Sequence, residues 1–260
     1  MDAESRAAHR GIPATRDTDV QRLRGPGGQS VSRHGPAEEL LRSRSQLLLH
    51  PVVRVLIFLL CLAPALLLTL DWLAELGLLD GWRSSLGPDQ IRDTEIRTGL
   101  WTLRFLAITL AVTPARQLLG LGALAKYRRS FGLFAFFYAC VHLATWTWAD
   151  TNFDLPFMWK EIVKHKYILV GMVTFLLLLP LAITSTTGWI KRLGGRRWNR
   201  LHRLIYVAGV TGTIHYLWAV KKDTFFPVVY FVVFALLLGY RVARAARDRQ
   251  VWGIRSRRAA

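Results

Sequence analysis

The stretch WNRLHRLIYVAGVTGTIHYLWAV, residues 198–220, organises the rest of the chain. It combines an apolar run long enough for a membrane helix with two imidazoles, His202 near its start and His215 near its end. An ionisable side chain inside a membrane span is costly, so it usually marks a functional site and needs a partner. Because neutral imidazole is a good axial ligand for haem iron, the stretch predicts a haem-binding membrane helix.

A third histidine, His142, lies in another apolar run, FGLFAFFYACVHLATWTW, residues 131–148. Two helices that present histidines at matching depths can hold a porphyrin between them. The candidate metal ligands are therefore His142, His202 and His215.

The composition is that of a protein with several membrane spans. Of 260 residues, 52% are hydrophobic although 20% are charged, so apolar and charged residues must occupy separate blocks. The formal net charge of +18 could suggest a nucleic-acid partner, but the arginines cluster beside apolar runs, as topology signals do. Cys61 and Cys140 each lie in an apolar run without CxxC or CxxCH, which supports neither a structural disulfide nor covalently attached haem.

The apolar runs predict an all-α integral membrane protein with six transmembrane helices. The spans are roughly residues 52–70, 98–113, 131–148, 167–183, 201–220 and 225–241. Pro64 is expected to kink the first span. The second, interrupted by Arg104, is shorter than the ~20 residues that a crossing normally needs.

The expected organisation is a six-helix domain between two basic tails. Residues 1–46 are rich in Arg, Gly, Ser, Pro and Asp without hydrophobic periodicity, and are interpreted as a disordered cytoplasmic tail. Residues 47–247 form the transmembrane domain, and residues 248–260 a second cytoplasmic tail. The linkers 114–130 and 188–200 are strongly basic, whereas the others are acidic or balanced. By the positive-inside rule both termini are cytoplasmic.

This orientation makes the third and fifth spans parallel. His142 and His215 then lie level near the outer face, where they are expected to ligate one haem as a bis-imidazole pair. His202 lies near the inner face, opposite Arg128. At the helical rise of 1.5 Å per residue, the inner and outer levels are about 20 Å apart, which leaves room for two stacked haems. Haem is thus expected between the third and fifth helices.

The spacing of the candidate ligands along the helix differs between the third and fifth spans. Arg128 and His142, 14 residues apart, return to nearly the same helix face. His202 and His215, 13 residues apart, fall on separate faces of an ideal helix. Gly209 and Gly212 are therefore candidate positions of a local irregularity.

Alternatives stay open at each site. A lone histidine in a span can bond a backbone carbonyl instead of a metal, although three at two consistent depths favour ligation. Arg128 either contacts the inner haem or is a topology charge beside Arg129. Arg104 either pairs with a haem propionate or extends to the outer interface.

Three stretches, RRSFGLFAFFYACVHL, RRWNRLHRLIYVAGVTGTIHYLWAVKK and LAITSTTGW, resemble the MsrQ (YedZ) family of haem-binding membrane subunits, within the ferric-reductase-like transmembrane group. The likeness covers roughly residues 47–247. It implies a multi-pass cytochrome b of the bacterial inner membrane with one or two b haems and a bound FMN. It also implies electron transfer from quinol to a periplasmic, molybdopterin-dependent (MsrP-like) methionine sulfoxide reductase that repairs oxidised proteins.

Two other classes of protein compete with this interpretation. A full ferric reductase would need flavin and nicotinamide domains, and no GxGxxG follows the sixth span. A transporter with intramembrane histidines usually needs a polar path, and the predicted span interiors lack acidic residues. We expect an electron-transfer subunit and not the catalytic subunit, because no molybdenum ligand or solvent-exposed redox cysteine is identifiable. The expected partners are quinol, the reductase and the lipid bilayer, without nucleic acid.

Overall fold

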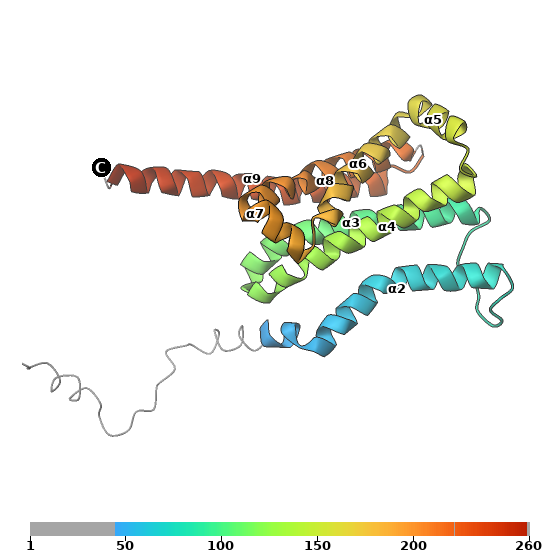
Figure 1. Cartoon of the computed structure of the whole chain (residues 1–260), viewed down its shortest axis with the longest axis horizontal. Helices are drawn as coiled ribbons and strands as arrows, with labels where there is room; N and C mark the ends of the chain where they lie inside the picture. Colours follow the sequence, from blue (N-terminus) through green and yellow to red (C-terminus); the bar gives the residue numbers. More distant parts are fainter. Residues whose placement is uncertain (1–44, 221, 259–260) are drawn as a thin grey trace, which may run out of the picture. The chain divides into compact units, whose positions relative to one another are not determined.

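The computed structural model describes residues 45–220 and 222–258, with side chains described up to residue 249. All regular structure in these residues is helical (Figure 1). The helices are α2 (Pro51–Glu75), α3 (Gln90–Leu119), α4 (Arg128–Thr145), α5 (Leu155–Lys164), α6 (Lys166–Ile183), α7 (Thr187–Leu201), α8 (Leu204–Ala219) and α9 (Phe225–Arg258). A 3-10 turn, η1 (Gly122–Lys126), precedes α4, and a π-helical turn, η2 (Trp146–Asp150), follows it. The tail predicted at residues 1–46 lies almost entirely outside the described residues.

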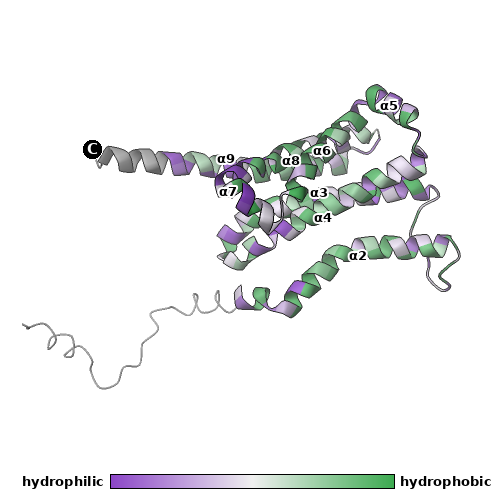
Figure 2. Ribbon diagram, viewed as in Figure 1, coloured by the Kyte–Doolittle hydropathy of each residue, from purple (hydrophilic) through white to green (hydrophobic). Residues whose placement is uncertain are grey.

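Five of the described helices are long and apolar enough to cross a membrane: α2, α3, α4 with η2, α6 and α9. The apolar helix α8 is shorter, at 16 residues. The protein is therefore an all-α, multi-pass membrane protein, while the sixth span and the orientation stay predictions. Hydrophobic residues colour most of α2, α6 and α8, and hydrophilic residues gather on α7 (Figure 2). Large apolar side chains exposed along α2 and α9 suit contact with lipid.

Helix α3 is longer than its predicted span. It has 30 residues and starts at Gln90, after Asp89 accepts a hydrogen bond from the Arg92 amide at 3.0 Å as the N-cap. The charged residues of its first turns lower the hydropathy, so the span appeared short in the sequence. Glu95, predicted to lie in a linker, is consequently part of this helix.

Two helices lie in segments predicted as linkers. Asp154 caps α5 by accepting from the Phe157 amide at 3.0 Å, and Thr186 caps α7 by accepting from Trp189 at 3.4 Å. The basic linker at residues 188–200 is thus mostly helix.

The core consists mainly of two helix pairs, α3 with α4 and α6 with α8, and α9 packs on α3 and α8. Leu106 and Leu110 of α3, Ala135 of α4 and Ala208 of α8 have no exposed surface. These four side chains form a dense apolar layer between the two ends of α4 and α8, which we name the central layer.

The two glycines of α8 serve close packing. A β-carbon at Gly209 would lie 2.7 Å from Phe234 of α9, and one at Gly212 would lie 3.2 Å from Leu103 of α3. Helix α8 is regular through both positions. The prediction of an irregularity at Gly209 and Gly212 is therefore wrong, and their small size explains their presence.

Tyr138 of α4 fastens α2 at its proline. Its hydroxyl donates to the Cys61 carbonyl at 2.9 Å and accepts from the Ala65 amide at 3.1 Å. A regular helix would join those two backbone groups directly. The hydroxyl thus bonds both groups beside Pro64, where a bend was predicted, and α2 changes direction along its length (Figure 1).

A buried carboxylate organises the connection between α2 and α3. Asp71 accepts from the Trp82 indole at 3.0 Å, from the Ser85 amide at 3.2 Å and from the Ser85 hydroxyl at 2.7 Å. Arg97 of α3 lies 3.3 Å from the same carboxylate. Each bond to the ionised carboxylate offsets part of the cost of burying it, so the connection is held against both helices.

Candidate cofactor sites

The structure brings together the two histidines that the sequence placed at one depth. The rings of His142 on α4 and His215 on α8 have centroids 6.1 Å apart and an interplanar angle of 77°. They belong to different helix pairs, so their meeting point lies where the two pairs of the core face each other. We name this place the His142 site.

Both imidazoles are held in one tautomer by backbone carbonyls. His142 Nδ1 lies 2.9 Å from the Glu95 carbonyl of α3, and His215 Nδ1 lies 2.7 Å from the Tyr167 carbonyl of α6. A carbonyl can only accept, so each Nδ1 carries the proton and each Nε2 keeps its lone pair. Histidines that ligate metals usually have this arrangement.

Two glycines make room for these rings. A β-carbon at Gly171 of α6 would lie 2.8 Å from His215 Nδ1, and one at Gly99 of α3 would lie 3.3 Å from His142 Cε1. Neither glycine was predicted from the sequence, because a glycine inside an apolar helix gives only a weak signal of close backbone approach.

The geometry suits an ion held between the imidazoles. Metal–imidazole nitrogen bonds are about 2.0–2.1 Å, so two opposed ligands place their ring centroids roughly 6 Å apart, close to the separation found. Within the described part of the chain, no group of three or more His, Cys, Asp or Glu side chains could hold a metal ion. The arrangement therefore fits an iron whose porphyrin supplies its own equatorial nitrogens.

A second candidate site surrounds His202. A cavity of about 540 Å³ is lined by both His202 and Arg128, and we name it the Arg128 cavity. The His202 ring stacks on the Trp198 ring with their centroids 3.8 Å apart, and its Nδ1 lies 3.2 Å from the Trp198 carbonyl. Its Nε2 is buried without a hydrogen-bond partner among the described residues. An orphaned imidazole nitrogen beside a cavity of cofactor size fits an axial ligand.

The helix carrying His202 differs from the prediction. His202 is the C-cap of α7, and a turn at His202 and Arg203 separates α7 from α8. His202 and His215 therefore do not share a helix, and the prediction of one span over residues 201–220 is wrong at this end. The change of direction occurs at Arg203, before Gly209 and Gly212.

The Arg128 cavity is electropositive. Arg128, Arg129 and Arg203 line it, and no acidic side chain does. Among the described side chains, no carboxylate lies within ion-pair distance of these arginines. The cavity therefore favours a ligand with anionic groups, and Arg128 faces the same space as His202.

Arg104 lies elsewhere. Its Nε donates to the Tyr230 hydroxyl of α9 at 3.2 Å, and its guanidinium carbon lies 4.5 Å above the Trp101 ring. It does not line the Arg128 cavity. Its observed partners are thus a phenol and an indole, which let a cation lie within α3.

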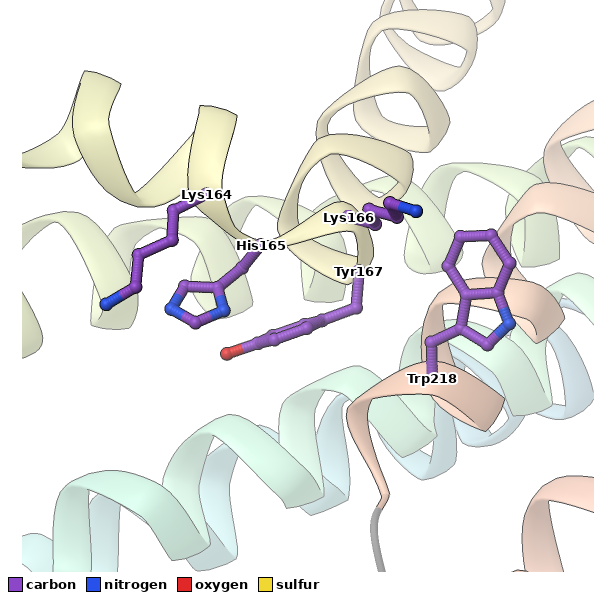
Figure 3. Close-up of a pocket in the computed structure, with 5 residues that line it drawn as sticks. All are labelled: Lys164, His165, Lys166, Tyr167 and Trp218. Atoms are coloured by element: carbon purple, nitrogen blue, oxygen red, sulfur yellow. The ribbon is translucent and has the colours of Figure 1, made fainter.

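A surface hollow adjoins the His142 site. Tyr167, whose carbonyl holds His215, lines a space of about 400 Å³ with Lys164, His165, Lys166 and Trp218 (Figure 3). His165 lies 3.2 Å from Glu161 and so belongs to the surface of α5. Tyr167 therefore contacts both the surface hollow, which it lines, and the imidazole of His215.

The comparisons with known proteins also indicate a membrane protein. Residues 98–213 match the family described as ferric reductase like transmembrane component, which gives the class of protein.

The relatives give a narrower assignment. Over 187 residues the sequence is 49% identical to the protein-methionine-sulfoxide reductase heme-binding subunit MsrQ of Xanthomonas campestris pv. campestris (strain 8004), covering 68% of this chain and 85% of that one. It is 44% identical over 176 residues to the MsrQ subunit of Azospira oryzae, covering 67% of this chain and 76% of the relative. The chain therefore belongs to the MsrQ family, as the sequence resemblance indicated.

Proposed function

We propose that this chain is a membrane cytochrome b that takes electrons from quinol and passes them to a periplasmic molybdopterin-dependent methionine sulfoxide reductase. Its relatives are named as heme-binding subunits of a protein-methionine-sulfoxide reductase. In this proposal the chain is a multi-pass protein of the bacterial inner membrane with six spans and both termini in the cytoplasm. The His142 site is then the outer site and the Arg128 cavity the inner site.

The observation that carries the proposal is the imidazole pair of the outer site. The 6.1 Å separation of the His142 and His215 rings and their carbonyl-fixed tautomers leave two Nε2 lone pairs for one iron. Bound haem would supply a reversible one-electron carrier at that place. The chain's own residues hold the ligands in position through the carbonyls of Glu95 and Tyr167.

The inner site is proposed to hold a second b haem. His202 offers one imidazole with an unpartnered Nε2, and the described lining offers no second histidine. Arg128 stands where a second ligand would be, and a guanidinium that stays charged is a poor iron donor. The inner haem is therefore expected to be held less tightly than the outer one. Bound FMN is part of the proposal through the family resemblance alone.

The direct test is to purify the chain and record its absorption spectrum before and after reduction by a quinol. A reducible b-type spectrum is expected, followed by reoxidation when a periplasmic MsrP-like reductase and methionine sulfoxide are added. The His142→Ala/His215→Ala double variant, which lacks both outer ligands, should not transfer electrons to the reductase. A colourless wild-type protein that moves a solute or protons would instead identify a transporter and contradict the proposal.

A further inference from the structure

Arg241 of α9 is held inside the helix bundle by neutral groups. Its Nη1 donates to the Tyr206 hydroxyl at 2.7 Å, and its Nη2 donates to the Leu110 carbonyl at 2.8 Å and the Thr113 hydroxyl at 3.1 Å. The Leu110 carbonyl has room for this donor because Pro114, four residues later, has no N–H to give it. No described carboxylate forms an ion pair with Arg241. Among the described residues its charge is therefore stabilised by neutral acceptors and not by a counter-ion.

Tyr206 connects this charge to the Arg128 cavity. It lines the cavity with His202, and the Arg241 guanidinium carbon lies 5.0 Å from the centre of its ring. A guanidinium only donates, so the Tyr206 oxygen is the acceptor in their bond and its own hydrogen is left for another acceptor. Within the described residues, the bond with Arg241 is the one that the Tyr206 hydroxyl makes. Tyr206 thus lines the cavity, and its hydroxyl keeps one hydrogen to donate.

The chemistry of the lining indicates what would accept this hydrogen bond. Three arginines and no acidic side chain surround the space, so an anionic oxygen is the favoured acceptor. Under the proposed function, on which this inference rests, the ligand of the inner site is haem and its propionates are carboxylates. A phenol polarised by a neighbouring guanidinium is a stronger donor than an isolated one.

We propose that Tyr206 is a cofactor-binding residue of the inner site and that Arg241 is its positioning residue. The Tyr206 hydroxyl donates a hydrogen bond to a carboxylate of the haem that His202 ligates. Arg241 keeps the phenol oriented and adds positive charge behind it. Withdrawing negative charge from the carboxylate favours ferrous over ferric iron, so the pair raises the midpoint potential of the inner haem.

The first experiment compares Tyr206→Phe with Tyr240→Phe in the purified full chain. Tyr206→Phe keeps the ring and removes the hydroxyl. The inner haem should then have a lower midpoint potential and dissociate about tenfold faster, as expected for the loss of a hydrogen bond to a charged group. Tyr240→Phe is the matched control, because its hydroxyl donates to Gln117 at 2.7 Å outside the cavity. It should change neither quantity.

The second experiment asks whether Arg241 acts through Tyr206. Arg241→Met should lower the inner potential more in the wild-type background than in the Tyr206→Phe background, because the loss of charge acts in both but the loss of the oriented hydroxyl acts only in the first. A purely structural role would lower thermal stability equally in both backgrounds and leave the potential unchanged, which would overturn the assignment of Arg241. An equal fall of the potential in both backgrounds would show that Arg241 does not act through Tyr206 and would overturn it too.

The outer haem separates failure of this inference from failure of the proposed function. If both haems bind and Tyr206→Phe changes neither the inner potential nor the dissociation rate, the hydrogen bond to the haem does not exist. If the wild-type chain binds no reducible haem, the proposed function itself is wrong. Where both haems bind, the potential of the outer haem, measured in the same sample, is the internal reference.

Discussion

Gly171 of α6 lies so close to His215 of α8 that a β-carbon on it would be 2.8 Å from the imidazole Nδ1. That nitrogen is the one bonded to the Tyr167 carbonyl. The backbone of α6 therefore determines both the tautomer and the position of the ring.

Gly171→Ala should disturb the outer haem without removing a ligand. The added methyl group displaces the His215 ring and lengthens its bond to Tyr167, so the low-spin fraction and the haem content should both fall. Electron paramagnetic resonance and haem stoichiometry measure the two effects. Gly239→Ala on α9 is the control, since nothing lies within 4 Å of its β-carbon position. Equal spectra for the two variants would mean that the ring does not depend on this contact.

His142→Ala and His215→Ala should each remove the same haem. The centroids of the two rings lie 6.1 Å apart, so either substitution would leave the iron with one protein ligand. The expected result is loss of one low-spin component from the spectrum in both variants. His165→Ala, whose imidazole pairs with Glu161 at the surface, should keep the full spectrum. Unchanged haem content in His142→Ala would disprove the pairing.

Arg128→His should strengthen the inner site. Arg128 and His202 line one cavity, so an imidazole at position 128 can supply the ligand that the inner iron lacks. Haem retention and the low-spin fraction should rise relative to wild type. If neither changes while His202→Ala still removes a haem, Arg128 is a topology charge only. Arg116→His, at an exposed position of α3 that does not line the cavity, is the comparison and should change neither quantity.

Asp71→Asn should destabilise the protein without changing its spectrum. The substitution places an amide among donors that now bond a carboxylate, so about 1–3 kcal/mol of stability should be lost. Thermal unfolding in detergent measures the loss. Asp80→Asn, at an exposed position of the same connection, should unfold like the wild type. A normal unfolding temperature for Asp71→Asn would show that the buried carboxylate is not needed there.

The purified chain alone should not reduce methionine sulfoxide. Within the described residues its cysteines are Cys61, which is buried, and Cys140, which lies within α4, and neither forms a disulfide. Supplied with quinol and sulfoxide but no partner enzyme, the preparation should show no turnover by mass spectrometry. Product formed without a reductase would contradict the assignment as an electron-transfer subunit.

The proximity of His142 and His215 could be predicted from the sequence because it depends on spacing. The apolar runs and basic linkers predict that the third and fifth spans are parallel. Parallel spans place His142 and His215 at the same depth. The tautomers could not be predicted in the same way. Their acceptors are the backbone carbonyls of Glu95 and Tyr167, and a backbone atom leaves no trace in residue type.

Helix boundaries predicted from hydropathy were wrong at two places, one where the backbone turns within an apolar run and one where charged residues belong to a membrane helix. The chain turns at His202 and Arg203, but the leucines around them conceal the break, so α8 was predicted too early. The span predicted for α3 was too short, because Arg97 and its charged neighbours lower the hydropathy of its first turns. In the structure Arg97 forms an ion pair with Asp71. The two residues of this ion pair are 26 positions apart in the sequence, so a hydropathy window of helix length cannot detect it.

The central layer has an electrical consequence. Leu106, Leu110, Ala135 and Ala208 have no exposed surface, so this layer offers no surface to solvent. In the proposed orientation an electron would cross this layer from the cytoplasmic to the periplasmic side without an accompanying ion. A membrane that is negative inside drives that movement, by up to about 2.3 kcal/mol per 100 mV for a full crossing. The membrane voltage of the cell would thus assist protein repair outside it, and an uncoupler that collapses the voltage would slow that repair even with quinol in excess.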